Sequence, residues 1–164
     1  MKNVIFFLGI LASGLISACN QPQYNSDKVA ADSISAAAMK NQCYQAVFEK
    51  DTGDLNIQTD KDGKVTGDLV MKYGLKPNEV ERVINKGKVD GSFRGDTLFL
   101  NYLYTSGELN KTLYQNPLAF LRTGDQLAMG VGEIETSVGR SYFVKNKPID
   151  FEKGRFKFAP VECK

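Results

Sequence analysis

The chain reads KVTGDLVMK over residues 64–72 and KVDGSFR over residues 88–94. In both stretches every second residue is apolar or glycine: Val65, Gly67, Leu69 and Met71 in the first, and Val89, Gly91 and Phe93 in the second. A period of two is typical of an antiparallel strand that turns one face toward a core. Both stretches are therefore predicted to be strands with one apolar face.

The alternation extends over much of residues 43–164. It recurs at Leu127, Met129 and Val131 and again at Phe156 and Phe158. Turn-forming residues separate the alternating runs, at Asp51–Asp54, Asp60–Lys64, Gly95-Asp96, Ser106–Asn110 and Gly124-Asp125. About eight strands of ordinary length fit into this part of the chain.

The pattern predicts an all-β fold. We expect a small antiparallel up-and-down barrel, calycin-like in outline, because closing a sheet on itself leaves no exposed edge. A β-sandwich of two sheets is the alternative. In a barrel of this kind the first and last strands are neighbours.

Two near-repeats indicate a regular architecture. Residues 64–69 resemble residues 88–93, and residues 95–98 resemble residues 124–127. The first pair places Gly67 and Gly91 on the inward faces, where a glycine marks a bend or the close approach of another group. We expect these glycines to allow the curvature of a small barrel, with space for a ligand as the alternative.

Residues 73–86 fit two structures. Pro77, Val80, Val83 and Ile84 have the spacing of one helical turn that caps the barrel mouth. The segment also fits a continuation of the strands, and we expect a long hairpin that turns near Asn85-Lys86-Gly87.

The first residues have the features of a lipoprotein signal peptide. Lys2 precedes an apolar run from Val4 to Ile16, and the run ends in the lipobox Ile16-Ser17-Ala18-Cys19. Roughly 18 apolar residues are needed to span a bilayer, so this run is too short to remain as an anchor. We predict that residues 1–18 are removed and that an acylated Cys19 attaches the chain to a lipid bilayer.

The remaining chain divides into a tether and a domain. Residues 19–42 are rich in polar residues and alanine and lack the large apolar residues that a core needs. A frayed helix over residues 28–40 is compatible with this composition. We predict an acylated N-terminus and tether over residues 19–42 and a β-barrel domain over residues 43–164.

The chain has three cysteines. If Cys19 carries lipid, Cys43 and Cys163 are the remaining pair in an oxidising export compartment. We predict a disulfide between them that joins the first strand to the last, and two free buried thiols are the alternative.

Charge and the residue after Cys19 bear on partners and location. The formal net charge is +2, which provides no basic field for nucleic acid, so no nucleic-acid partner is expected. The expected location is the cell envelope. Asn20 is not the aspartate associated with retention in the inner membrane, so we favour the outer membrane.

Several short motifs together resemble a group of Bacteroidota lipoproteins. They are Cys43-Tyr44, Val65-Thr66-Gly67, residues 89–98 (VDGSFRGDTL), Tyr102-Leu103-Tyr104, Thr105-Ser106-Gly107-Glu108 and Cys163. The resemblance implies a lipobox followed by a small β-domain, and it adds no chemistry. Residues 81–87 depart from the charged, Asn-rich turn of the group.

The composition argues against common catalytic and metal sites. The chain has no histidine, which excludes Ser-His-Asp and Cys-His catalysis and removes the usual metal-binding imidazole. Asp60, Asp62 and Gly63 imitate part of a calcium loop, but its twelfth position falls on Leu69 instead of a bidentate Glu. We therefore predict no cofactor and no metal.

Paired carboxylates are the remaining route to an enzyme, because glycoside hydrolysis needs two acids across a cleft. The available acids are Asp68, Asp90, Glu108, Asp125, Glu133 and Glu135. Their positions in outward strand faces and turns favour a solvated surface, so a non-enzymatic protein is predicted.

Aromatic residues are the best candidates for recognition. We assign ligand binding to Phe99, Tyr102, Tyr104 and Tyr142, because residues 99–104 are apolar on both faces of a strand. Packing inside the barrel is the alternative. The predicted function is an envelope lipoprotein that binds a small apolar ligand, a glycan or a protein through its barrel. An inhibitor of a host enzyme such as lysozyme is the alternative, because Gly139-Arg140-Ser141-Tyr142 loosely resembles the loop of such inhibitors.

Overall fold

The computed structural model describes residues 40–75, 77 and 80–164. The predicted signal peptide, the acylation site Cys19 and the predicted frayed helix before residue 40 lie outside these residues. Within them, the structure contains no helix long and apolar enough to cross a membrane.

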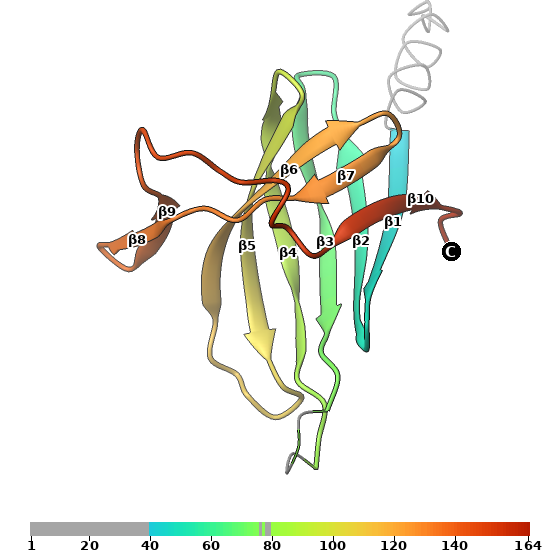
Figure 1. The fold of residues 1–164 in the computed structure, drawn as a ribbon, viewed down its shortest axis with the longest axis vertical. Helices are drawn as coiled ribbons and strands as arrows, with labels where there is room; N and C mark the ends of the chain where they lie inside the picture. Colours follow the sequence, from blue (N-terminus) through green and yellow to red (C-terminus); the bar gives the residue numbers. More distant parts are fainter. Residues whose placement is uncertain (1–39, 76, 78–79) are drawn as a thin grey trace, which may run out of the picture.

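Eight antiparallel strands form a closed barrel (Figure 1). Their order around the barrel is β1-β10-β7-β6-β5-β4-β3-β2, so the first and last strands are neighbours. The strands are β1 (Lys40–Phe48), β2 (Asp51–Thr59), β3 (Lys64–Lys72), β4 (Ile84–Arg94), β5 (Thr97–Ser106), β6 (Tyr114–Thr123), β7 (Gln126–Met129) and β10 (Lys157–Val161). The predicted barrel is confirmed, and the β-sandwich alternative is wrong.

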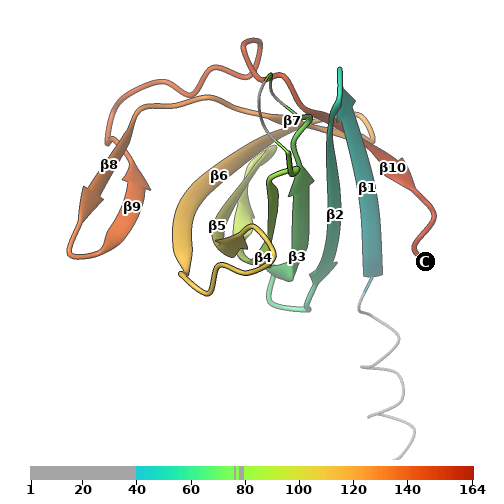
Figure 2. The ribbon, with the colours of Figure 1, turned by 90° about the horizontal axis from the view of Figure 1, so that it is seen from below.

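Two further strands lie beside the barrel. β8 (Ile134–Ser137) and β9 (Arg140–Phe143) pair only with each other and form a hairpin, which we call the arm. Viewed from below, the arm lies next to β6 and outside the ring of strands (Figure 2). All four residues of β8 are exposed, and its sequence, IETS, has no apolar alternation from which the strand could be predicted.

The first predicted turn is wrong. Asp51–Asp54 belongs to β2, and the turn before it is made by Glu49 and Lys50, with Glu49 at φ 54°. The two aspartates bind partners instead of forming the turn. Asp51 Oδ1 accepts the Gly74 N–H at 2.7 Å, and Asp54 Oδ2 lies 3.2 Å from Lys72 Nζ.

Other element boundaries also differ from the prediction. Residues 40–42, assigned to the tether, pair with β2, because backbone pairing does not require apolar side chains. β7 ends at Met129, and Val131 forms an isolated bridge with Asp150. The predicted long hairpin is present, because residues 73–83 connect the antiparallel strands β3 and β4. Its turn is not at residues 85–87, since these residues lie within β4.

The two copies of the first near-repeat, residues 64–69 and 88–93, lie side by side in β3 and β4. Their antiparallel register pairs Val65 with Gly91 and Gly67 with Val89, so each glycine lies opposite a valine. A Cβ on Gly67 would collide with Asn56 O of β2, and a Cβ on Gly91 would collide with Phe99 O of β5. Glycine is therefore required here because the neighbouring backbones approach closely.

Large apolar side chains pack together inside the barrel. Phe120, Phe158, Leu55, Ile57, Leu69, Leu98 and Leu127 are fully buried and belong to one cluster. None of the described polar or charged residues is buried. The inward face of the sheet is thus a packed core.

Candidate functional site

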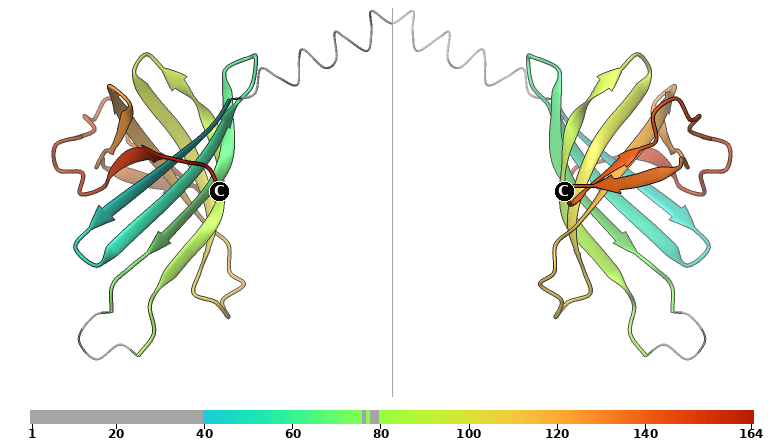
Figure 3. Two further views of the ribbon diagram at one scale, coloured as in Figure 1. Left: turned by 90° about the vertical axis from the view of Figure 1, so that its right-hand side faces the viewer. Right: turned by 90° about the vertical axis from the view of Figure 1, so that its left-hand side faces the viewer.

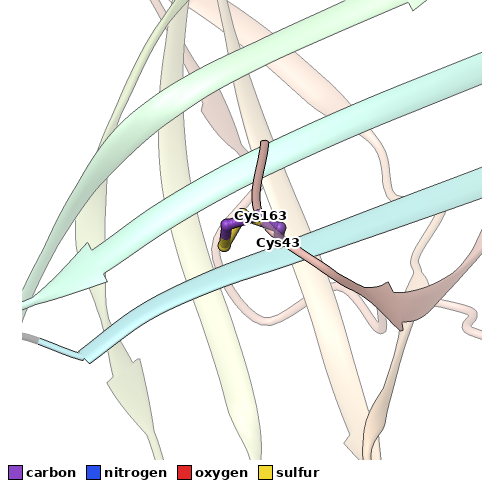
Figure 4. Close-up of a disulfide and its surroundings, with 2 residues drawn as sticks. All are labelled: Cys43 and Cys163. Atoms are coloured by element: carbon purple, nitrogen blue, oxygen red, sulfur yellow. A yellow bond between two sulfur atoms is a disulfide. The ribbon is translucent and has the colours of Figure 1, made fainter.

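The seam of the barrel is closed by a disulfide between Cys43 and Cys163 (Figure 4). Cys43 lies in β1, and Cys163 follows the end of β10 by two residues, with their Cα atoms 5.3 Å apart. The predicted pairing is confirmed, and the free-thiol alternative is wrong. The left-hand view of Figure 3 shows the side of the barrel on which β1 and β10 lie.

The four predicted ligand residues are divided between the two faces of the sheet. Tyr102 and Tyr104 point inward, where Tyr102 is 3% exposed and the two rings stack at 4.5 Å. Phe99 lies on the outer face of β5, and Tyr142 lies in β9 of the arm, where it is 45% exposed. The structure therefore brings together Phe99 and Tyr142 but not all four residues.

The inward pair acts in packing. The Tyr102 hydroxyl donates to Leu69 O at 3.0 Å, and Asn116 Nδ2 donates to the Tyr104 hydroxyl at 3.1 Å. Burial raises the pKa of Tyr102 well above its usual value of 10.0, and burial also raises the pKa of Tyr104. For these two residues the packing alternative fits the structure.

Tyr102→Phe tests this buried hydroxyl. The variant leaves Leu69 O without its partner, so we expect it to lose about 1 kcal/mol of unfolding free energy at neutral pH. Above about pH 10 the unfolded wild type ionises Tyr102 while the folded state does not, so wild-type stability falls as pH rises. Urea unfolding should show the difference between the two proteins shrinking from pH 9 to pH 11. A difference that does not change with pH contradicts the burial of the hydroxyl.

The outward pair lines a groove between the barrel and the arm. The groove has a volume of about 720 Å³, within the range of small-molecule sites. One wall is the outer face of β4, β5 and β6, and the other is β9. Its lining includes Arg94, Phe99, Asn101, Leu103, Gln115, Pro117, Arg140, Tyr142 and Phe143.

The position of the arm is determined by packing at its base. A Cβ on Gly130 would collide with Ile149, and a Cβ on Gly132 would lie 2.8 Å from Phe143 Cδ1. Val131 and Asp150 exchange two backbone hydrogen bonds, at 2.9 and 2.8 Å. These contacts join the segments on either side of the arm, and the Gly130 N–H donates to Ala119 O of β6 at 2.8 Å, which ties the base of the arm to the barrel.

The groove combines aromatic rings with hydrogen-bonding groups. The Arg94 guanidinium lies 5.1 Å from the centre of the Phe99 ring. On the same wall, Asn101 Nδ2 donates to Asp90 Oδ1 at 3.3 Å, while Asn101 Oδ1 is buried without a partner among the described residues. Such a mixture binds ligands that have both an apolar face and polar groups.

Sequence reasoning missed Arg94, Asn101 and Gln115 as site residues, and it considered Arg140 only as part of the loop of an enzyme inhibitor. Arg94, Asn101 and Gln115 are ordinary polar residues on an outward strand face, and only the arm turns this face into a groove. The one sequence feature that indicated this site was that residues 99–104 are apolar on both faces of the strand, which led to the assignment of Phe99.

Two other hollows flank the disulfide, with volumes of about 420 and 640 Å³. No aromatic residue lines the first hollow, and Tyr44 is the single aromatic residue that lines the second. They present mostly polar strand surface, so the groove beside the arm is the stronger candidate for recognition.

The acids considered for catalysis lie on the surface. Asp68 is paired with Lys88, with Oδ1 and Nζ 2.8 Å apart, and Asp90 accepts from Asn101. Asp60 Oδ1 accepts the N–H groups of Asp62 and Lys64, which makes residues 60–64 a tight polar turn. Over the described ranges, no group of three or more Asp, Glu or Cys side chains is placed to hold a metal ion.

Comparison of the chain with protein-family models, curated proteins and solved structures found no match.

Proposed function

We propose that this chain is a lipid-anchored, non-enzymatic protein of the cell envelope that binds an oligosaccharide in the groove between the barrel and the arm. The observation that carries the proposal is that Phe99 and Tyr142 line the same groove from different elements, outside a barrel whose interior is packed. Of the three ligand classes considered from the sequence, a small apolar ligand inside the barrel has the least support, because core side chains occupy the interior.

The lining favours a sugar over a purely apolar ligand. A pyranose ring offers an apolar C–H face and a rim of hydroxyl groups. Phe99, Tyr142 and Phe143 provide ring surfaces for the C–H face, while the side-chain amide of Gln115 provides a donor and an acceptor for the hydroxyl groups.

The anchor follows from the sequence prediction for Cys19. The described domain begins at Lys40, so residues 20–39 separate the acylated cysteine from β1. Fully extended, such a segment spans roughly 65–70 Å. That reach lets the domain sample sugars at a distance from the membrane, and the outer membrane is the location we favour.

Phe99→Ala and Tyr142→Ala test the groove. We expect each substitution to weaken oligosaccharide binding by roughly tenfold or more, because each removes an aromatic contact at the centre of the site. Purified mature protein would be screened on an array of bacterial and host glycans, and the affinity for each hit would be measured by calorimetry.

Tyr114→Ala is the matched control for these variants. Tyr114 is 40% exposed, compared with 45% for Tyr142, and it does not line the groove. Its variant should bind as the wild type does. Absence of binding to every glycan, or binding that Phe99→Ala and Tyr142→Ala leave unchanged, contradicts the proposal.

The tip of the arm supports a second candidate function. Val138 is 99% exposed, and Val138 and Gly139 both have positive φ, so the tight turn before Arg140 projects into solvent. A projecting turn with an arginine is the form expected for a loop that enters an enzyme cleft. If this loop inhibits an enzyme, the wild-type protein should slow lysozyme at micromolar concentration, and Arg140→Ala should abolish the inhibition. A wild-type protein that does not inhibit lysozyme excludes this function.

A further inference from the structure

We infer that the oligosaccharide bound in the groove carries an anionic group, a carboxylate or a sulfate, which Arg94 and Arg140 recognise. This inference rests on the proposed function and specifies the class of sugar. It follows from the charges that line the groove, from the position of the Arg94 guanidinium and from the two walls to which the arginines belong.

The charges in the groove are unbalanced. Arg94 and Arg140 are its two cationic residues, and Asp90 is its single acid. The Asp90 carboxylate already accepts from Asn101 Nδ2. Among the ion pairs found within the described residues, none includes Arg94 or Arg140. The groove therefore has an excess of positive charge that a ligand anion would complement.

Arg94 is held in an orientation suited to an anion. Its guanidinium carbon lies 5.1 Å from the centre of the Phe99 ring, which stabilises the cation by interaction with the ring face. A guanidinium that contacts an aromatic ring in this way still has N–H groups available for hydrogen bonds. Those groups can donate to the paired oxygens of a carboxylate or a sulfate.

The two arginines come from opposite walls of the groove. Arg94 is the last residue of β4 in the barrel, and Arg140 is the first residue of β9 in the arm. Asp96 in the β4–β5 turn and Glu135 in β8 lie outside the lining, and neither forms an ion pair with these arginines within the described residues. Phe99 and Tyr142 come from the same two walls, so a sugar ring that contacts these aromatics would place its acidic substituent within the reach of the arginines.

Calorimetry with three related ligands tests the inference. The ligands are an oligosaccharide of uronic acids, the same oligosaccharide with its carboxyl groups reduced to alcohols, and a sulfated form of the reduced chain. We expect the wild-type mature protein to bind at least one acidic form roughly tenfold or more tightly than the neutral form at low salt. Which acidic form binds more tightly identifies the anion.

Arg94→Gln, Arg140→Gln and their combination identify the residues responsible. The double variant should lose the preference for the acidic form, measured as the ratio of its affinities for the acidic and neutral forms. Arg82→Gln, an exposed arginine in the β3–β4 connection, is the matched control and should keep the preference. Thermal unfolding of each variant verifies that it is folded.

The possible outcomes separate the two proposals. If the neutral form binds as tightly as both acidic forms and Phe99→Ala weakens the binding of all three ligands, recognition of an anionic group is wrong. The oligosaccharide site then stands. A preference that persists in the double variant also overturns the inference. If Phe99→Ala changes the binding of no ligand, the oligosaccharide site itself is wrong.

Discussion

Replacing Cys43 and Cys163 with serine should lower the free energy of unfolding by about 4–5 kcal/mol, because the bond closes a long loop in the unfolded chain. The two cysteines are separated by 120 residues. Domains of this size have a total stability of about 5–15 kcal/mol, so the variant should be only marginally stable. Urea unfolding of the double variant and the wild type measures the difference.

The seam also explains why the bond matters in the folded barrel. β10 pairs with β1 at only three positions, Cys43 with Val161, Tyr44 with Pro160 and Gln45 with Ala159, and with β7 at only two. Hydrogen exchange in the variant should therefore increase first in β10. As a control, dithiothreitol should destabilise the wild type by a similar amount and leave the double variant unchanged. A loss below about 1 kcal/mol would mean that the seam is held without the disulfide.

Phe158→Ala should lower the free energy of unfolding by about 3–5 kcal/mol, the range for removing a buried ring from a packed core. Phe158 in β10 is fully buried, and its ring meets the edge of Phe120 with centroids 5.5 Å apart at an interplanar angle of 84°. Gly53 leaves room for it, since a Cβ there would lie 2.7 Å from Phe158 Cζ. Few neighbours can fill the space that alanine would leave.

Two variants help to interpret that result. Phe158→Leu retains much of the apolar volume, so chemical unfolding should show a smaller loss than for alanine. Phe99→Ala, on the outer face of the sheet, should change stability by less than either core variant. A loss for Phe158→Ala no larger than that for Phe99→Ala would contradict the packed interior.

Much of the barrel could be predicted because several strands have one face in the core and the other in solvent. The alternation of Val65, Leu69 and Met71 with the residues between them predicted β3. The disulfide was predictable by elimination once Cys19 was assigned to lipid. Aspartates were misleading at Asp51 and Asp54, because their partners Gly74 and Lys72 lie far along the chain.

The groove was beyond the reach of sequence reasoning. Its two walls are separated in the chain by β7 and by the residues leading to the arm, and no local pattern connects Phe99 with Tyr142. The arm itself has an exposed first strand, and its position depends on contacts of Gly130 and Gly132 with residues that follow it. Residues 99–104 indicated a second apolar surface, but only the arm made that surface a site.

The central claim is that ligands bind outside the barrel, between the arm and the face of β4, β5 and β6. The most direct test is to titrate the isotope-labelled mature protein with a glycan that binds and to map the NMR chemical-shift changes. We predict that the changes concentrate at Phe99, Leu103 and Tyr142 and that Leu69 and Tyr102 in the interior remain unaffected. Changes centred on those interior residues, or on the hollows beside the disulfide, would contradict the account.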